Sequence, residues 1–167
     1  MELKSLKDLL IHTLQDVYSA EKQIIKALPK MIKATSNEEL KKAFETHLKE
    51  TEKQKERLEQ VFDQIGARPG RMKCKAMEGL VEEGKELMEE DIDADVLDAG
   101  LIAAAQKIEH YEIATYGTAR VYAEQLGEEA VTDLLSQTLE EERKTDELLT
   151  DLAMSSVNLE AEHAGKK

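Results

Sequence analysis

The chain has 167 residues, which fits one domain with a buried core, and a formal net charge of −13. Such a charge repels nucleic-acid phosphates and anionic lipid surfaces, so it argues against both as primary partners. Cys74 is the one cysteine in the sequence, which excludes a disulfide framework and a cysteine-based zinc or iron–sulfur site.

The residue types predict an all-α protein. Aromatic residues make up 4% of the chain and Trp is absent, whereas the helix formers Leu, Ala, Glu, Lys, Met and Gln dominate. The N-terminus, MELKSLKDLL, has no apolar signal-peptide region, and no stretch approaches the roughly 20 apolar residues of a membrane span. We therefore expect a single cytoplasmic domain over residues 1–167.

The first half of the chain predicts a helical hairpin. Apolar residues recur with a 3.6-residue period from about Ser5 to Lys33, which indicates a first long helix. Thr35 or Ser36 is expected to cap the second helix, which runs from about 38 to 64. The glycines and proline that follow, from Gly66 onward, end it.

The second half predicts another hairpin after a long connection. Residues 71–90 carry a weaker helical pattern and are interpreted as a crossover helix. Long helices are expected over 93–125 and 128–153, and the polar tail 154–167 is expected to fray and be flexible. Two antiparallel hairpins joined by a crossover define a ferritin-like four-helix bundle.

Acidic residues interrupt the apolar stripes of these helices. In the first helix, Glu21 lies four residues from both Val17 and Ile25, on the same face, and Asp16 lies near that stripe. In the second, the stripe that includes His47 is interrupted around Glu50 and Gln54. The candidate metal ligands on the four helices are Glu21, Glu50, Glu109, Glu112, Glu142 and Asp146, together with His47 and Asp16.

Those acids also match in height along the bundle. Glu21 lies 14 residues before the first turn, near residue 35, and Glu50 lies 15 residues after it. Glu112 and Glu142 lie 15 residues on either side of the second turn, near Gly127. Because each helical residue rises about 1.5 Å, the four acids are expected at one level.

Buried carboxylates need neutralising by protons, basic side chains or metal ions, because an isolated buried charge is costly. Most nearby basic residues fall off the inward stripes, with Arg57 as the exception. Oxygen-rich ligation favours iron or manganese over zinc or copper. The outward-facing basic residues are Lys22, Lys53, Lys107, Arg143 and Lys144.

Several runs carry a family resemblance. DVYSAEKQIIKALPKM (16–31), HLKETEKQKERLEQVF (47–62) and EHYEIATYGT (109–118) resemble the YciF-type bacterial stress-protein family of the ferritin-like superfamily. The resemblance covers nearly all of the chain except the tail. It implies a rubrerythrin-like fold, a homodimer and a di-iron centre. The metal ligands it implies are Glu21, Glu50, Glu109, Glu112 and Glu142.

The sequence departs from the common di-iron pattern of a Glu-x-x-His in two of four helices. The second helix has the reverse order, His47-x-x-Glu50, and the fourth has Asp146 where His is expected. No Cys-x-x-Cys module of the rubredoxin type is present to supply electrons. The metal, the number of ions and their redox competence therefore stay open at this point.

Two functions from different classes remain. The first is a di-metal carboxylate protein, binding iron or manganese and reacting with peroxide or dioxygen during stress, with Glu50 and Glu142 bridging the ions. Glu21, Glu109, Glu112 and Asp146 would then be terminal ligands. The second is a non-enzymatic dimeric helical bundle without a used metal site; a storage cage is a third option.

Some residues near the predicted site can be interpreted in two ways. His47 is either a hydrogen-bonded core histidine or a metal ligand, whereas His110 is expected to face outward. Tyr116 is either a packing residue or, with Gln54, a hydrogen-bond partner of the ligand carboxylates. Cys74, without a resolving cysteine, is expected to be inert.

Overall fold

The computed structural model describes residues 3–164, and within them the regular structure is entirely helical, which confirms the predicted fold class. In the same part of the chain, no helix combines the length and apolar character needed to cross a membrane. The helices are α1 (Leu6–Ala34), α2 (Glu38–Ile65), α3 (Lys75–Glu89), α4 (Ala94–Gln125), α5 (Glu129–Leu152), the π-helical segment η1 (Ala153–Val157) and α6 (Asn158–Ala164).

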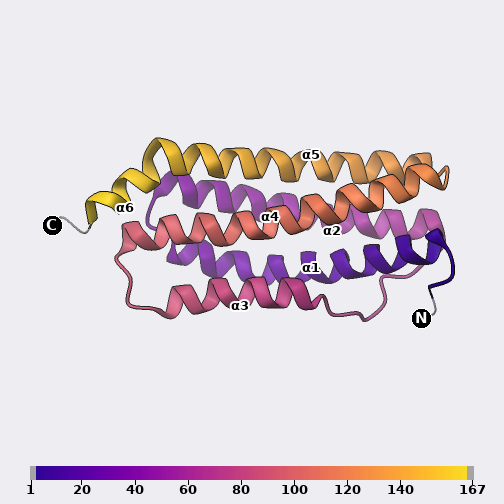
Figure 1. The fold of residues 1–167 in the computed structure, drawn as a ribbon, viewed down its shortest axis with the longest axis horizontal. Helices are drawn as coiled ribbons and strands as arrows, with labels where there is room; N and C mark the ends of the chain where they lie inside the picture. Colours follow the sequence, from indigo (N-terminus) through magenta and orange to yellow (C-terminus); the bar gives the residue numbers. More distant parts are fainter. Residues whose placement is uncertain (1–2, 165–167) are drawn as a thin grey trace.

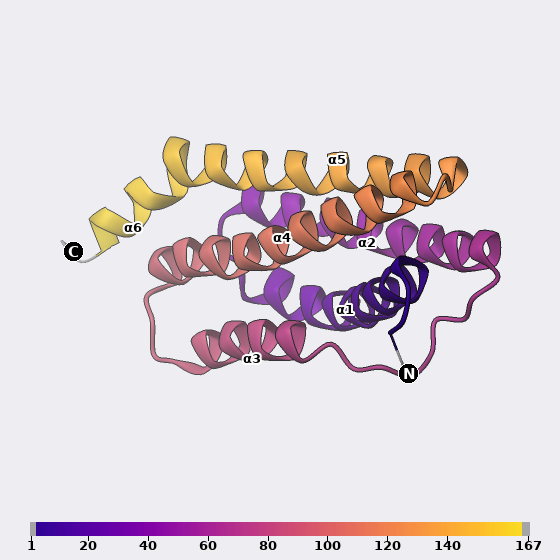
Figure 2. The same ribbon diagram turned by 45° about the vertical axis from the view of Figure 1, so that its right-hand side comes forward.

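Four long helices form the bundle, and α3 lies outside it. α1 and α2 form one antiparallel hairpin, and α4 and α5 form the other (Figure 1). α3 runs back along the outside of α1 and α4, so that α2 and α4 point in the same direction (Figures 1 and 2). This is the two-hairpin arrangement with one crossover that the sequence predicted.

The start of α2 differs from the prediction. Its cap is Asn37, whose side-chain oxygen accepts hydrogen bonds from two backbone N–H groups of the first turn, at 3.0 and 3.1 Å. Thr35 instead donates to the Met31 carbonyl. Ser36 donates through its backbone and its hydroxyl to the buried Asp98 of α4. Asp98 therefore ties the first hairpin to the second.

Two glycines show how the helices end and pack. Gly66 has φ = 67° and ends α2 in the left-handed conformation, as the sequence predicted. At Gly100 of α4, an added Cβ would lie 2.8 Å from a methyl carbon of Leu87 on α3. A side chain at Gly100 would therefore displace the Leu87 side chain where α3 packs on α4.

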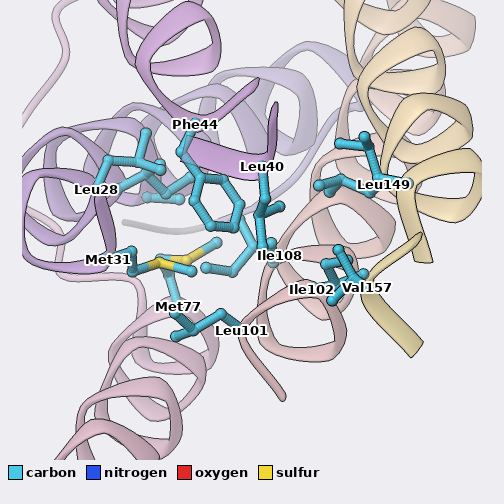
Figure 3. Packing of buried hydrophobic residues seen from close by; sticks show 14 of the residues in the cluster. Leu28, Met31, Leu40, Phe44, Met77, Leu101, Ile102, Ile108, Leu149 and Val157 are labelled. Carbon is cyan, nitrogen blue, oxygen red and sulfur yellow. The ribbon is translucent and has the colours of Figure 1, made fainter. Parts of the chain in front are cut away.

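The hydrophobic core is divided into two clusters. The first apolar cluster lies near the α1–α2 turn and includes Leu28, Leu40, Phe44, Leu101 and Leu149 (Figure 3). The second lies toward the α4–α5 turn. Its buried members include Leu10, Leu14, Leu58, Phe62, Ala119, Val131 and Leu135.

The C-terminal segment also differs from the prediction. Residues 153–164 are helical rather than frayed; the last three residues of the predicted tail lie outside the described part. Val157 is fully buried in the first apolar cluster, together with Ile102 and Leu149 (Figure 3). Burial of the Val157 side chain holds the C-terminal segment against α4, and the polar composition of this segment did not indicate such a contact.

Candidate metal centre

A layer of polar side chains separates the two apolar clusters in all four long helices. On α1, Glu21 lies between Val17 of the second cluster and Ile24 of the first. Each member of the layer is at most 4% exposed. The central polar layer consists of Glu21 (α1), His47 and Gln54 (α2), Glu109 and Glu112 (α4), and Glu142 (α5).

Four of these side chains converge on one point. His47, Glu109, Glu112 and Glu142 each place one donor atom so that all four atoms lie within 4.8 Å of one another. The His47 Nε2 atom lies 3.1 Å from the Glu109 Oε1 atom. Three helices thus bring one imidazole and three carboxylates to a spacing that fits metal ligation.

Most atoms of these side chains have no hydrogen-bond partner among the described residues, and the approach of His47 Nε2 to Glu109 Oε1 is a close contact rather than a hydrogen bond. Both carboxylate oxygens of Glu112 and of Glu142 are buried without one, and so are both ring nitrogens of His47. One oxygen each of Glu21 and Glu109 is in the same state. Each unpartnered buried polar group costs about 1–3 kcal/mol, so this concentration of them requires a neutralising partner.

The charges of the layer act on one another. Burial raises the pKa of Glu21, Glu109 and Glu112 well above the ordinary carboxyl value, and the neighbouring Glu142 raises each of them further. Burial lowers the pKa of His47, so its imidazole is neutral at pH 7. A neutral imidazole is the form that binds metal, and a cation among the carboxylates would favour their ionised state.

Tyr116 binds one oxygen of Glu21, the acidic member of the layer on α1. This fully buried tyrosine of α4 donates its hydroxyl to Oε1 of Glu21, which leaves Oε2 of Glu21 without a partner. The sequence placed Tyr116 beside a ligand carboxylate, one turn beyond Glu112. The structure assigns the hydrogen bond to Glu21, where it fixes the direction of the remaining oxygen.

Two predicted site residues lie at the edge of the layer. Glu50 is half-buried and outside the converging set, because the inward stripe of α2 passes through His47, Thr51 and Gln54. Burial nonetheless raises the pKa of Glu50, and the negative charges of Glu141 and Glu142 raise it further. Its predicted role as a bridging ligand has no support in this arrangement.

Asp146 also lies off the centre, one turn beyond Glu142 on α5. Its side chain is 22% exposed and pairs with the exposed His110 at 3.3 Å. It also accepts a hydrogen bond from Gln106 at 3.1 Å. Asp146 therefore has partners of its own, and His110 faces outward as expected.

Asp16 is separated from the centre by its hydrogen bonds. It accepts from the Tyr111 hydroxyl and lies 3.3 Å from the Cys74 Sγ atom, on the side of α1 that faces the start of α3. Burial raises the pKa of the Cys74 thiol, and its sulfur accepts from the Met77 N–H at the start of α3. Asp16 and Cys74 therefore help to attach the crossover helix α3 to α1.

With this geometry established, comparison with known proteins decides the family. The family described as "Domain of unknown function (DUF892)" matches residues 5–162, almost the whole chain. The chain belongs to the DUF892 family. Protein YciF of Escherichia coli K12 is 54% identical over 164 residues, covering 98% of this chain and 99% of YciF. The resemblance seen in the sequence is therefore confirmed.

Solved structures agree with this membership of DUF892. The crystal structure of the E. coli stress protein YciF matches with a TM-score of 0.90, covering 93% of this chain and 99% of that one. YcfI of Rhodopseudomonas palustris, described as a proposed structural protein, matches with a TM-score of 0.87 at 45% identity, covering 89% and 95%. A Xanthomonas campestris protein at 22% identity, with a TM-score of 0.75 and covering 94% and 96%, shares the fold.

Beside the centre, this DUF892 chain also has an ion pair that the sequence reasoning missed. Arg57 faces inward, as expected, but binds Glu141 through two hydrogen bonds of 2.9 and 3.0 Å and Thr138 through one of 2.6 Å. Gln54 donates to Glu141 as well, at 3.1 Å. Burial alone would raise the pKa of Glu141, but the hydrogen bonds from Arg57 and Gln54 lower it.

This pairing decides what Arg57 does for the central polar layer. Both of its hydrogen-bonding nitrogens are directed to Glu141 and Thr138, so it neutralises Glu141 rather than the converging carboxylates. The five basic residues that were expected to face outward are all exposed. In the described part of the chain, basic side chains therefore leave the converging carboxylates unneutralised.

Proposed function

We propose that this protein binds a pair of iron or manganese ions in its central polar layer. The observation that carries the proposal is the set of buried oxygens and ring nitrogens without hydrogen-bond partners. His47, Glu109, Glu112 and Glu142 would be direct ligands, since their donor atoms already converge. Glu21 would add the oxygen that Tyr116 leaves free.

Charge and ligand type support this choice of metal. When ionised, Glu21, Glu109, Glu112 and Glu142 carry four negative charges, which two divalent cations would balance, while His47 is neutral. A set dominated by carboxylate oxygens with one imidazole suits iron or manganese better than zinc or copper. The departure from the Glu-x-x-His pattern therefore still leaves a chemically suitable set.

The proposed chemistry is the reduction of peroxide or dioxygen. A bound pair of such ions would supply electrons to an O–O bond. The chain's own contributions are positioning and exclusion: Tyr116 orients Glu21, and the two apolar clusters keep bulk water from both ends of the layer. The relative YciF is described as a stress protein, and we extend a stress-related role to this chain, acting as a homodimer.

The test is an anaerobic titration with Fe(II) or Mn(II), followed by metal analysis. Two ions per chain are expected for the wild type, and a marked loss for Glu142→Gln, whose carboxylate is central to the set. Glu140→Gln is the matched control, because Glu140 is exposed and pairs with Lys144 on the outer face of α5. Substoichiometric metal that is equal in all three proteins would contradict the proposal.

A second function has one observation in its favour. One donor atom each of Glu109, Glu112 and Glu142 lies within 4.8 Å of the others, so a small movement would let protonated carboxyl groups hydrogen-bond to one another. Protons would then neutralise the layer, and the protein would be a non-enzymatic dimeric bundle. Thermal unfolding with and without chelator separates the two functions, because only the metal protein loses stability when the chelator is added. Size-exclusion chromatography showing a dimer would dismiss a storage cage.

A further inference from the structure

A pocket of about 220 Å³ lies among α1, α3 and α4. Its inner surface is mainly apolar and includes Ala27, Met31, Val81, Met88 and Ile108. Because α3 forms its outer wall, the pocket exists only where the crossover helix covers the bundle. It is distinct from the converging carboxylates, none of which lines it.

A second, much smaller void lies deeper in the bundle. It has a volume of about 10 Å³ and is lined by Ile24 and Leu28 of α1, and by His47 and Glu109 of the facing helices. Two members of the candidate metal centre thus form part of its wall. This void places empty space directly against the site.

The pocket and the void share three wall residues: Ala27, Met31 and Ile108. No other residue lines both. From these shared walls we propose that the two cavities form an entry path for a small neutral molecule with an O–O bond, namely dioxygen or hydrogen peroxide, with Met31 as its gate. The inference rests on the proposed function, and it adds where the oxidant enters.

The walls select for a small neutral molecule. The inner void has room for about one water-sized molecule, and an ion would lose its hydration on crossing the apolar walls. Met31 is unbranched, with three rotatable side-chain bonds, so it can swing without displacing a helix. Ala27 lines both cavities beside Met31 and has the smaller side chain, so a larger residue there would narrow the path.

The mouth of the pocket argues against entry of the metal by the same route. Lys26, Lys30 and Lys85 line it, and the first two are exposed. Lys85 is paired with Glu82 at 2.9 Å, but the ammonium groups of Lys26 and Lys30 repel a divalent cation and leave a neutral molecule unaffected. The metal and the oxidant would therefore reach the centre from different sides.

The first test locates the path without any metal. Crystals of the metal-free protein are pressurised with xenon or krypton, which collect in apolar cavities. A gas atom is expected against Ala27, Met31 and Ile108 in the wild type and in the control Ala114→Leu, whose residue is exposed on α4. It should be lost in Ala27→Leu, which fills the shared wall. No gas atom there in the wild type, or equal occupancy in Ala27→Leu, would overturn the proposal.

The second test measures passage. Protein loaded anaerobically with Fe(II) is mixed with hydrogen peroxide in a stopped-flow instrument; two Fe(II) ions each give one electron, and peroxide with two protons becomes two waters. We expect Ala27→Leu to slow this oxidation at least about tenfold. Its Fe(II) affinity should match that of the wild type and of Ala114→Leu.

The outcomes separate the path from the function. If the wild type binds Fe(II) and Ala27→Leu reacts at the same rate, the path is wrong while the proposed function stands. If the wild type binds no Fe(II), the proposed function is wrong, and the path falls with it. A slower reaction together with weaker Fe(II) binding would also count against the path, because the substitution would then have altered the centre.

Discussion

The first apolar cluster and the central polar layer are built by the same helices but satisfied in different ways. In the cluster, apolar side chains such as Phe44, Leu101 and Leu149 are buried among other apolar side chains (Figure 3). In the layer, one to two helical turns away, the oxygens of Glu112 and Glu142 find none. The apolar cluster stabilises the bundle, whereas the buried carboxylates of the layer need a bound partner that neutralises them.

The largest expected effect concerns the cluster alone. Phe44→Ala removes a fully buried ring, and its loss should lower the free energy of unfolding by about 3–5 kcal/mol. The number of metal ions bound per folded chain should stay the same. Urea denaturation measures the first quantity, with Leu148→Ala, at an exposed position, as the control within about 0.5 kcal/mol. Loss of metal from folded Phe44→Ala would show that the two regions are not independent.

A substitution in the central polar layer should have the opposite effect on stability. Glu142→Leu removes the carboxylate that raises the pKa of three neighbours, so the metal-free protein should gain about 1–4 kcal/mol. The same variant should lose its metal. Denaturation in the presence of chelator gives the stability, and a less stable metal-free variant would show that Glu142 contributes to the fold itself.

A smaller effect sharpens the role of Tyr116. Tyr116→Phe keeps the ring but removes the hydroxyl that orients Glu21, and metal affinity should fall about 10- to 100-fold. Competition with a chelator of known affinity measures the change. Tyr122→Phe, further along α4 beside the second apolar cluster, is the control and should bind normally.

The smallest expected effect is the pH dependence of the metal-free protein. Burial raises the folded-state pKa of Glu21, Glu109 and Glu112, so their contribution is complete below the ordinary carboxyl pKa and is lost as pH rises through the raised values. His47 acts oppositely: its pKa is lowered by burial, so its contribution is lost as pH falls below its ordinary value.

Three carboxyls against one imidazole should leave a net fall in thermal stability as pH rises from about 5 to 8, on the order of 1 kcal/mol. Saturating Mn(II) should abolish the fall, because bound metal holds the carboxylates ionised. Thermal melts with chelator and with Mn(II) measure it. A metal-free protein that becomes more stable over this interval would contradict the assigned shifts.

The fold could be predicted because each helix repeats its pattern over many turns. The hairpins, the crossover and the end of α2 at Gly66 all followed from periodicity and turn residues. The position of Val157 could not be predicted, since a single apolar residue in a polar segment has no period. The cap at Asn37 depended on Asp98, which is distant in sequence and competes for Ser36.

The site could be predicted in part. The interrupted stripes placed Glu21, Glu109, Glu112 and Glu142 in one layer, and the structure brings them there with His47. The positions of the remaining acids could not be predicted, because they depend on small differences in direction around the helix axis that periodicity does not resolve. Neighbouring residues differ by 100° around a helix, so a stripe interrupted at Glu50 also admits Thr51, and the tertiary structure turns Thr51 inward. Asp16, Asp146 and Glu141 each found partners on another helix that no local pattern indicates.

Anomalous diffraction at the iron edge, from crystals soaked anaerobically in Fe(II), tests the central claim most directly. We predict two strong peaks inside the bundle, within about 2.0–2.3 Å of carboxylate oxygens of Glu112 and Glu142, one of them bound by His47. Peaks confined to surface carboxylates, with the central polar layer empty under saturating Fe(II), would contradict it.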